Sequence, residues 1–173
     1  KEGAKVVLCD VNYEKLESVK EEILQYTNEV LIYNCDVSDE KKVYEMVSDA
    51  QEKFGTIDIL INNAGFGVFG EFIETSLDKE LNMIDLNIKA VHILTKLFLK
   101  DFKKKDSGYI LNVASSAAFS PGPLMASYYA SKAYVLRLTE AIYEELRREK
   151  SNVSVSCLCP GPVRTSFMDR ANV

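Results

Sequence analysis

The sequence predicts an α/β fold with a doubly wound parallel sheet and helices on both faces. Two observations favour this class. Short apolar runs rich in valine and isoleucine, typical of strands buried on both faces, alternate with longer stretches of helical periodicity. Polar residues and glycine follow directly after these runs, as expected where strands end at a ligand-binding edge. Strands that alternate with helices favour right-handed crossovers within one parallel sheet.

Five strands and four helical stretches are predicted in alternation. The strands are expected at 4–10, 29–36, 56–65, 108–115 and 152–161. The helical stretches are expected at about 13–26, 76–104 and 124–149, with a further one between the second and third strands that carries the apolar stripe Val43, Met46, Val47 and Ala50. Ser38 is expected to cap the second stretch, and the lysines at 103–105 to close the third, because cations are favoured at helix C-termini. Since no linker or repeat interrupts the pattern, residues 1–173 are expected to form a single domain.

Composition excludes several classes of function. The formal net charge of -5 gives the chain no electrostatic reason to bind nucleic acid. No apolar run approaches the roughly 20 residues that cross a bilayer, so no membrane segment is expected. One histidine and four cysteines in apolar runs do not indicate a metal site, and free thiols in a reducing cytoplasm are expected instead. The cysteines are Cys9, Cys35, Cys157 and Cys159.

The polar residues that follow the predicted strands describe one candidate site. Ligands of an open parallel sheet bind in the crevice outside the carboxyl ends of its strands. The residues found there are Asp10, Asp36, Asn62, Asn63, Ala64, Gly65, Ser115, Pro160 and Gly161.

Asp10 is a candidate for the adenosine end of a dinucleotide. An acid at the end of a second strand can accept hydrogen bonds from ribose hydroxyls and repel a 2′-phosphate, which favours NAD over NADP. A turn-forming aspartate is an equally open interpretation. The glycine-rich phosphate loop belongs about 20 residues before such an acid, so that loop and its central strand are expected upstream of residue 1.

Tyr128 and Lys132 are four residues apart and are predicted to share one helix face. A nearby ammonium lowers the pKa of an acid, so Lys132 is expected to bring the Tyr128 phenol toward neutral pH and make it a usable proton donor. Chance accounts for most such pairs in helices. The pair gains weight from Ser115 at a strand end, whose hydroxyl can hold a substrate oxygen against the phenol.

These residues occur in an order that resembles the short-chain dehydrogenase/reductase family. The matching segments are Asp10, CDV at 35–37, NNAG at 62–65, DLNIKAV at 85–91, NVASS at 112–116, YYASK at 128–132 and PGPVRT at 160–165. The resemblance covers nearly the whole chain and implies a Rossmann-like fold. It also implies that the first strand, with its glycine loop, and a C-terminal substrate-covering segment are missing from residues 1–173.

The resemblance implies a set of catalytic residues. Tyr128 matches the acid-base, and Lys132 matches the residue that lowers its pKa and binds the nicotinamide ribose. Ser115 matches the serine that orients the substrate carbonyl, whereas Ser116 is one place out of register. Asn87 matches the asparagine of a water-mediated proton relay, with a helix-kinking polar residue as the alternative.

The resemblance also implies cofactor contacts. Asp36 and Val37 match the pair beside the adenine, and Asn63 matches a contact in its turn with Ala64 and Gly65. Asn62 is either part of that turn or a structural bridge between strands. The positions matched to the nicotinamide side are Tyr128, Lys132, Pro160, Gly161, Val163 and Thr165.

The expected function is a cytoplasmic NAD-dependent oxidoreductase, with NADP possible as cofactor, that interconverts a secondary alcohol and a ketone. Two alternatives stay open: a dinucleotide sensor without turnover, and an epimerase or dehydratase of the same superfamily. The long helices resemble those that pair across subunits, which implies a homodimer or homotetramer. Several apolar residues near Ser115 form either a wall of the substrate site or part of the core or a subunit interface. They are Phe119, Pro121, Leu124 and Met125.

Overall fold

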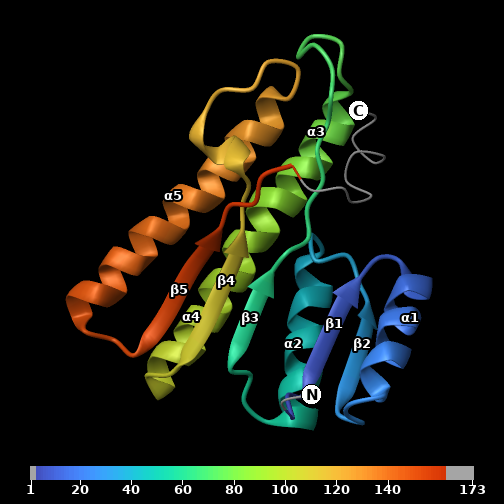
Figure 1. The fold of residues 1–173 in the computed structure, drawn as a ribbon, viewed down its shortest axis with the longest axis vertical. Helices are drawn as coiled ribbons and strands as arrows, with labels where there is room; N and C mark the ends of the chain where they lie inside the picture. Colours follow the sequence, from blue (N-terminus) through green and yellow to red (C-terminus); the bar gives the residue numbers. More distant parts are fainter. Residues whose placement is uncertain (1–2, 163–173) are drawn as a thin grey trace. The chain divides into compact units, whose positions relative to one another are not determined.

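The computed structural model of the chain describes residues 3–162. The chain divides into two compact units, residues 1–57 and 58–173, and each unit contains its own parallel sheet (Figure 1). All five predicted strands form, and the predicted α/β class is confirmed. The strands form two parallel sheets, one of two strands and one of three, rather than one. A single domain over 1–173 stays a prediction.

The first unit has two strands and two helices. β1 (Val6–Asp10) pairs in parallel with β2 (Val30–Asn34), and α1 (Tyr13–Leu24) connects them. α1 begins after Asn12, whose side chain accepts the backbone N–H of Lys15 at 2.9 Å and so satisfies a free donor of the first turn. β2 leads into α2 (Glu40–Phe54).

The cap of α2 differs from the prediction. Asp39, not Ser38, is the N-cap, and its carboxylate accepts the backbone N–H groups of Lys41 and Lys42. The Ser38 hydroxyl instead donates to Asp36. A carboxylate next to the helix start competes better for these donors because its negative charge also complements the helix dipole.

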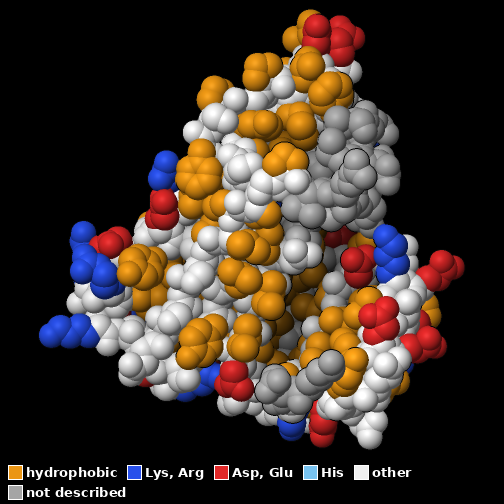
Figure 2. Space-filling model, viewed as in Figure 1, with side chains coloured by type: hydrophobic (Ala, Val, Ile, Leu, Met, Phe, Trp, Pro, Cys, Tyr) orange, Lys and Arg blue, Asp and Glu red, His pale blue; other side chains and the backbone are white. Residues whose placement is uncertain are grey.

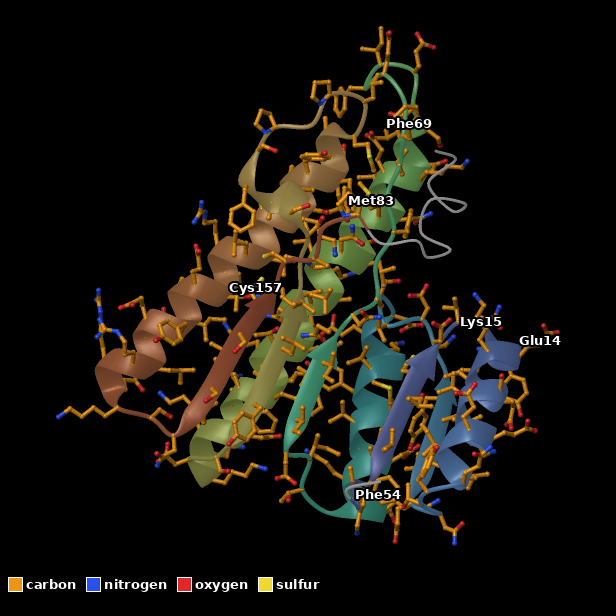
Figure 3. The ribbon with its side chains drawn as sticks, in the orientation of Figure 1. Glu14, Lys15, Phe54, Phe69, Met83 and Cys157 are labelled. Carbon is orange, nitrogen blue, oxygen red and sulfur yellow. The ribbon has the colours of Figure 1, made fainter. Side chains whose placement is uncertain are left out.

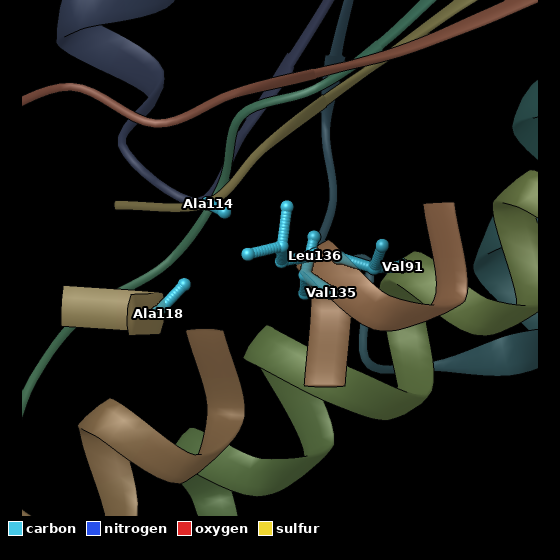
Figure 4. Close-up of a cluster of buried hydrophobic side chains, with 5 residues drawn as sticks. All are labelled: Val91, Ala114, Ala118, Val135 and Leu136. Carbon is cyan, nitrogen blue, oxygen red and sulfur yellow. The ribbon is translucent and has the colours of Figure 1, made fainter. Parts of the chain in front are cut away.

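The second unit contains a three-stranded parallel sheet in the order β3-β4-β5. Its strands are β3 (Ile59–Asn62), β4 (Gly108–Val113) and β5 (Val153–Leu158). α5 (Ala126–Glu149) lies along β5, as Figure 1 shows. Its apolar contact with the sheet is a cluster of buried side chains (Figure 4), which consists of Val91, Ala114, Ala118, Val135 and Leu136.

The helical stretch predicted at 76–104 is divided into three segments. α3 (Leu77–Ile84) passes through a π-helical turn (Asp85–Ala90) into α4 (Val91–Lys105). The three lysines predicted to close this stretch do form the last turn of α4. Single π-helical turns widen a helix and often occur at functional sites. This turn contains Asn87, one of the predicted site residues.

A buried network of polar side chains joins the strands to the helices of the second unit. The Asn62 amide donates to Asn112 Oδ1 at 2.8 Å and to Thr95 Oγ1 at 3.1 Å, and the Asn112 amide donates to Thr139 Oγ1 at 3.0 Å. All four side chains are buried, and these hydrogen bonds replace the hydrogen bonds to water that the side chains lose on folding. The structural alternative for Asn62, a bridge from β3 to β4, is therefore confirmed.

Within residues 3–162, no helix combines the length and the apolar character that crossing a membrane requires.

Candidate active site

The predicted site residues of the second unit lie where its strands end. The turn 63–65 follows β3, Ser115 follows β4, and Pro160 follows β5. Two backbone hydrogen bonds join the last two strand ends, because Ala114 N donates to Leu158 O and Ser116 N donates to Pro160 O, each at 2.8 Å. The segment that carries Ser115 is therefore held against the end of β5.

Ser115 and Tyr128 contact each other through a hydrogen bond between their side chains. Ser115 also starts a short 3-10 helix (Ser116–Phe119), where its Oγ accepts the backbone N–H of Ala117 at 3.1 Å. Tyr128 belongs to the first turn of α5 and is buried, with 8% of its surface exposed. The neighbouring Ser116 is exposed.

Lys132 lies one turn after Tyr128 on the same face of α5, as the spacing predicts. Its Nζ donates to the carbonyl oxygen of Val113 at 3.0 Å and lies 5.9 Å from the centroid of the Tyr128 ring. The side chain is only 6% exposed. The end of β4 therefore holds the ammonium beside the phenol.

The pKa of Tyr128 differs in direction from the sequence expectation. Burial raises the pKa of Tyr128 above its ordinary value, and the hydrogen bond to Ser115 opposes this only in part. Burial also lowers the pKa of Lys132, since the protein interior disfavours its charged form. Desolvation is thus the largest cause of the pKa shift in both groups.

Asn87 fastens the segment after β3 to α5. Its side chain is fully buried; Oδ1 accepts the backbone N–H of Phe66 at 3.1 Å, and Nδ2 donates to Phe66 O at 2.9 Å. Nδ2 also donates to Ser131 Oγ at 3.1 Å, and the Ser131 hydroxyl donates to Tyr128 O at 2.7 Å. The asparagine therefore acts as a clamp in this structure.

Ser131 is a site residue that the sequence analysis missed. It is fully buried and connects Asn87 to the backbone of Tyr128. The available signal was its position three residues after Tyr128, which places a small hydroxyl on the same helix face.

Gly65 lies directly against the catalytic candidates. A Cβ atom at this position would stand 3.0 Å from Asn87 Oδ1 and 3.3 Å from Lys132 Nζ. Such distances are tighter than ordinary contacts, so a side chain here would displace one of the two groups. Gly65 is thus brought next to Lys132 and Asn87.

The predicted adenosine-side residues belong to the first unit. Asp10 is exposed at the end of β1, and its Oδ1 accepts the backbone N–H of Asn12 at 2.8 Å, so it does form a turn. Asp36 Oδ1 accepts from the backbone N–H and the hydroxyl of Ser38, and Val37 follows it. Val163 and Thr165 lie outside the described residues.

No group of three histidine, cysteine or acidic side chains within residues 3–162 is arranged as metal ligands would be. The one histidine of the chain, His92, shares a hydrogen bond between its Nδ1 and the Tyr134 hydroxyl at 2.7 Å.

Known proteins are similar to this chain in sequence and in fold. An uncharacterized oxidoreductase of Staphylococcus aureus (strain USA300) is 34% identical over 166 residues, which cover 96% of this chain and 70% of the relative. A short chain dehydrogenase/reductase from Burkholderia phymatum, solved in complex with NAD, has a TM-score of 0.91 at 32% identity. It is matched over 98% of this chain and 60% of its own.

A metagenomic short-chain oxidoreductase solved with NADP has a TM-score of 0.84 at 33% identity, over 94% of this chain and 73% of its own. The sequence profile of the short chain dehydrogenases matches residues 1–172. The chain belongs to the short-chain dehydrogenase/reductase family of oxidoreductases.

Proposed function

We propose that the protein is an NAD(P)-dependent oxidoreductase that interconverts a secondary alcohol and a ketone, with Tyr128 as the acid-base. The observation that carries the proposal is the hydrogen bond between Ser115 and Tyr128 beside the buried Lys132. The three groups come from two elements and meet at the carboxyl end of a parallel strand, where α/β folds bind ligands.

The residues present fit a nicotinamide dinucleotide. An ammonium has three N–H donors, and Val113 accepts one of them from Lys132, which leaves donors for ribose hydroxyls. Gly65 keeps the space beside this ammonium free of a side chain. The related structures from Burkholderia and the metagenome hold NAD and NADP, which supports either form of the cofactor. When bound, the nicotinamide supplies or accepts the hydride.

Ser115 and Tyr128 have separate tasks in the proposed reaction. The Ser115 hydroxyl holds the substrate oxygen, and the Tyr128 phenol passes its proton to that oxygen in the direction of reduction. The raised pKa of Tyr128 keeps the phenol protonated at neutral pH, which suits a proton donor. In the direction of oxidation, the phenolate accepts the proton of the alcohol.

The surroundings of Tyr128 favour an apolar substrate. Tyr128 packs with Met83 and Ala117, and the partly buried apolar side chains around them are Phe66, Val68, Met125 and Tyr129. Of the residues expected to form either a substrate wall or core and interface, Phe119 is 63% and Leu124 43% exposed, so neither is a core residue in this structure. Hydrophobic side chains also gather at one end of the second unit (Figure 2). A ketone with hydrophobic substituents matches these surfaces.

The test is to measure NADH and NADPH binding separately by fluorescence. Oxidation of whichever cofactor binds is then followed with a panel of hydrophobic ketones. We expect binding with turnover, fastest for ketones with hydrophobic substituents. Binding without turnover across the panel would favour a dinucleotide sensor. Binding of neither cofactor would contradict the proposal.

A further inference from the structure

Two thiols stand side by side at the end of β5, next to the candidate active site. The Sγ atoms of Cys157 and Cys159 are 3.8 Å apart, and both side chains are half-buried. Residues two apart in an extended chain point to the same face, and Val153 and Val155 of this face are buried. Cys157 lies near the C-terminal end of β5 (Figure 3).

The pair adjoins groups that position the site. Both cysteines pack against the cluster of Val135 and its neighbours, and negative charge on either sulfur acts on the Lys132 ammonium. Leu158, which separates them, accepts the hydrogen bond from Ala114 N, and Pro160, which follows them, accepts that from Ser116 N. Any change in the backbone of 157–160 is therefore transmitted to the segment of Ser115.

We propose that Cys157 and Cys159 form a reversible, peroxide-sensitive disulfide that loosens the segment of Ser115 from β5. The bridge requires the sulfurs to approach from 3.8 Å to about 2.05 Å. Two residues of an extended strand span about 6.6 Å, near the upper end of the Cα separations that disulfides tolerate. The strand must bend to close the bridge, and a strained bridge is readily reduced again.

The chemistry balances with a peroxide as the oxidant. The Cys159 thiolate attacks one peroxide oxygen, the O–O bond breaks, and hydroxide leaves to take up the proton released by the thiol. The Cys157 sulfur then attacks the Cys159 sulfenic acid; the S–S bond forms and a second water leaves. Burial, followed by the neighbouring Cys159, raises the pKa of Cys157 to about 11, so Cys157 stays a thiol until this second step.

The other cysteines offer a control within the same protein. Cys9 donates a hydrogen bond from its sulfur to Cys35 O at 3.4 Å, and burial is the main reason that the pKa of Cys9 is raised to about 12. Both belong to the first unit, whereas Cys157 and Cys159 belong to the second. Trypsin places Cys157 and Cys159 together in the peptide 151–164, apart from Cys9 and Cys35.

The test is to treat the protein with hydrogen peroxide, block free thiols by alkylation and digest it with trypsin. The mass of the peptide 151–164 is then measured by mass spectrometry. We expect this peptide to lose two hydrogens and to resist alkylation until dithiothreitol is added. Hydrogen exchange at Ala114 and Ser116 should become at least about tenfold faster on oxidation, because their acceptors move. Turnover should fall and recover in parallel.

The variants Cys157→Ser and Cys159→Ser should each abolish the disulfide and the faster hydrogen exchange. The double variant Cys9→Ser/Cys35→Ser should respond to peroxide as the wild type does. Two free thiols in the peptide after oxidation would overturn the proposal. A disulfide that forms without any change in hydrogen exchange at Ala114 and Ser116 would overturn the proposed effect on the segment of Ser115. Neither readout requires turnover, so failure here is distinguishable from failure of the proposed oxidoreductase.

Discussion

Lys132 stands 5.9 Å from the centre of the Tyr128 ring, yet its hydrogen bond goes to the backbone of Val113. The position of the ammonium therefore does not depend on the phenol hydroxyl. Removal of that hydroxyl should leave Lys132 and its contacts in place. The proton-transfer role of Tyr128 can thus be tested apart from cofactor binding.

We expect Tyr128→Phe to lower kcat by about 10²- to 10⁴-fold, the usual contribution of general acid-base catalysis. The cofactor Kd should change little, because Lys132 keeps its contact with Val113. Steady-state kinetics and a fluorescence titration measure the two quantities. Tyr134→Phe, which removes only the hydrogen bond to His92, is the control and should keep its rate. A tenth of wild-type activity in Tyr128→Phe would rule out the proposed role.

The pH dependence should differ between the two directions of reaction. Because burial raises the pKa of Tyr128, the phenol stays protonated through neutral pH, and the rate of ketone reduction should be flat there. Alcohol oxidation requires the phenolate, so its kcat/KM should rise with pH until the pKa of Tyr128 is passed. Rate profiles in both directions measure this. An oxidation rate that falls on the alkaline side of neutral pH would contradict the assignment.

Lys132→Met should abolish turnover and yet stabilise the fold by about 1 kcal/mol at neutral pH, as expected where function and stability conflict. The pKa of Lys132 is lowered by burial, so the folded state binds its proton less tightly than the unfolded chain does. Below the lowered pKa, the buried charge destabilises the fold in full. This penalty declines as pH rises toward the ordinary lysine pKa of about 10.4.

Urea unfolding at several pH values measures the effect. The difference in the free energy of unfolding between Lys132→Met and the wild type should become smaller above neutral pH. The exposed Lys96 supplies the control, since Lys96→Met should change the free energy of unfolding little. A variant less stable than the wild type at neutral pH would show that the bond to Val113 outweighs the burial of the charge.

Asn87→Ala should lower the free energy of unfolding by about 2–4 kcal/mol, because the partly buried backbone groups of Phe66 and the buried Ser131 Oγ each lose a hydrogen bond to Asn87. Thermal and urea unfolding measure the loss. The exposed Asn82 in the preceding helix gives a matched variant, Asn82→Ala, which should be nearly neutral. Equal effects of the two changes would contradict the clamp.

Asp10→Ala should reduce the preference for NADH over NADPH by about tenfold, because a carboxylate repels a 2′-phosphate and favours ribose hydroxyls. The ratio of the two dissociation constants is the measurement. Asp58→Ala removes an exposed carboxylate that pairs with Lys105, and it should leave this ratio unchanged. An unchanged ratio in Asp10→Ala would limit that residue to its turn with Asn12.

Much of the candidate site could be predicted from local patterns. The spacing of Tyr128 and Lys132 determines a shared helix face, and the position of Ser115 after an apolar run places it at a strand end. These properties depend on residues close in the sequence. The same holds for the five strands and for the lysine-rich end of α4.

The sequence by itself determined which residues face one another along a helix or follow a strand, because the 3.6- and 2-residue periods are properties of the local backbone. The tertiary structure alone decided which groups are desolvated and which atoms they contact. The bonds of Asn87 to Phe66 and Ser131, the bond from Lys132 to Val113 and the raised pKa of Tyr128 all depend on elements far apart in the chain. Burial is a result of packing, and packing of distant segments is what a local pattern does not specify.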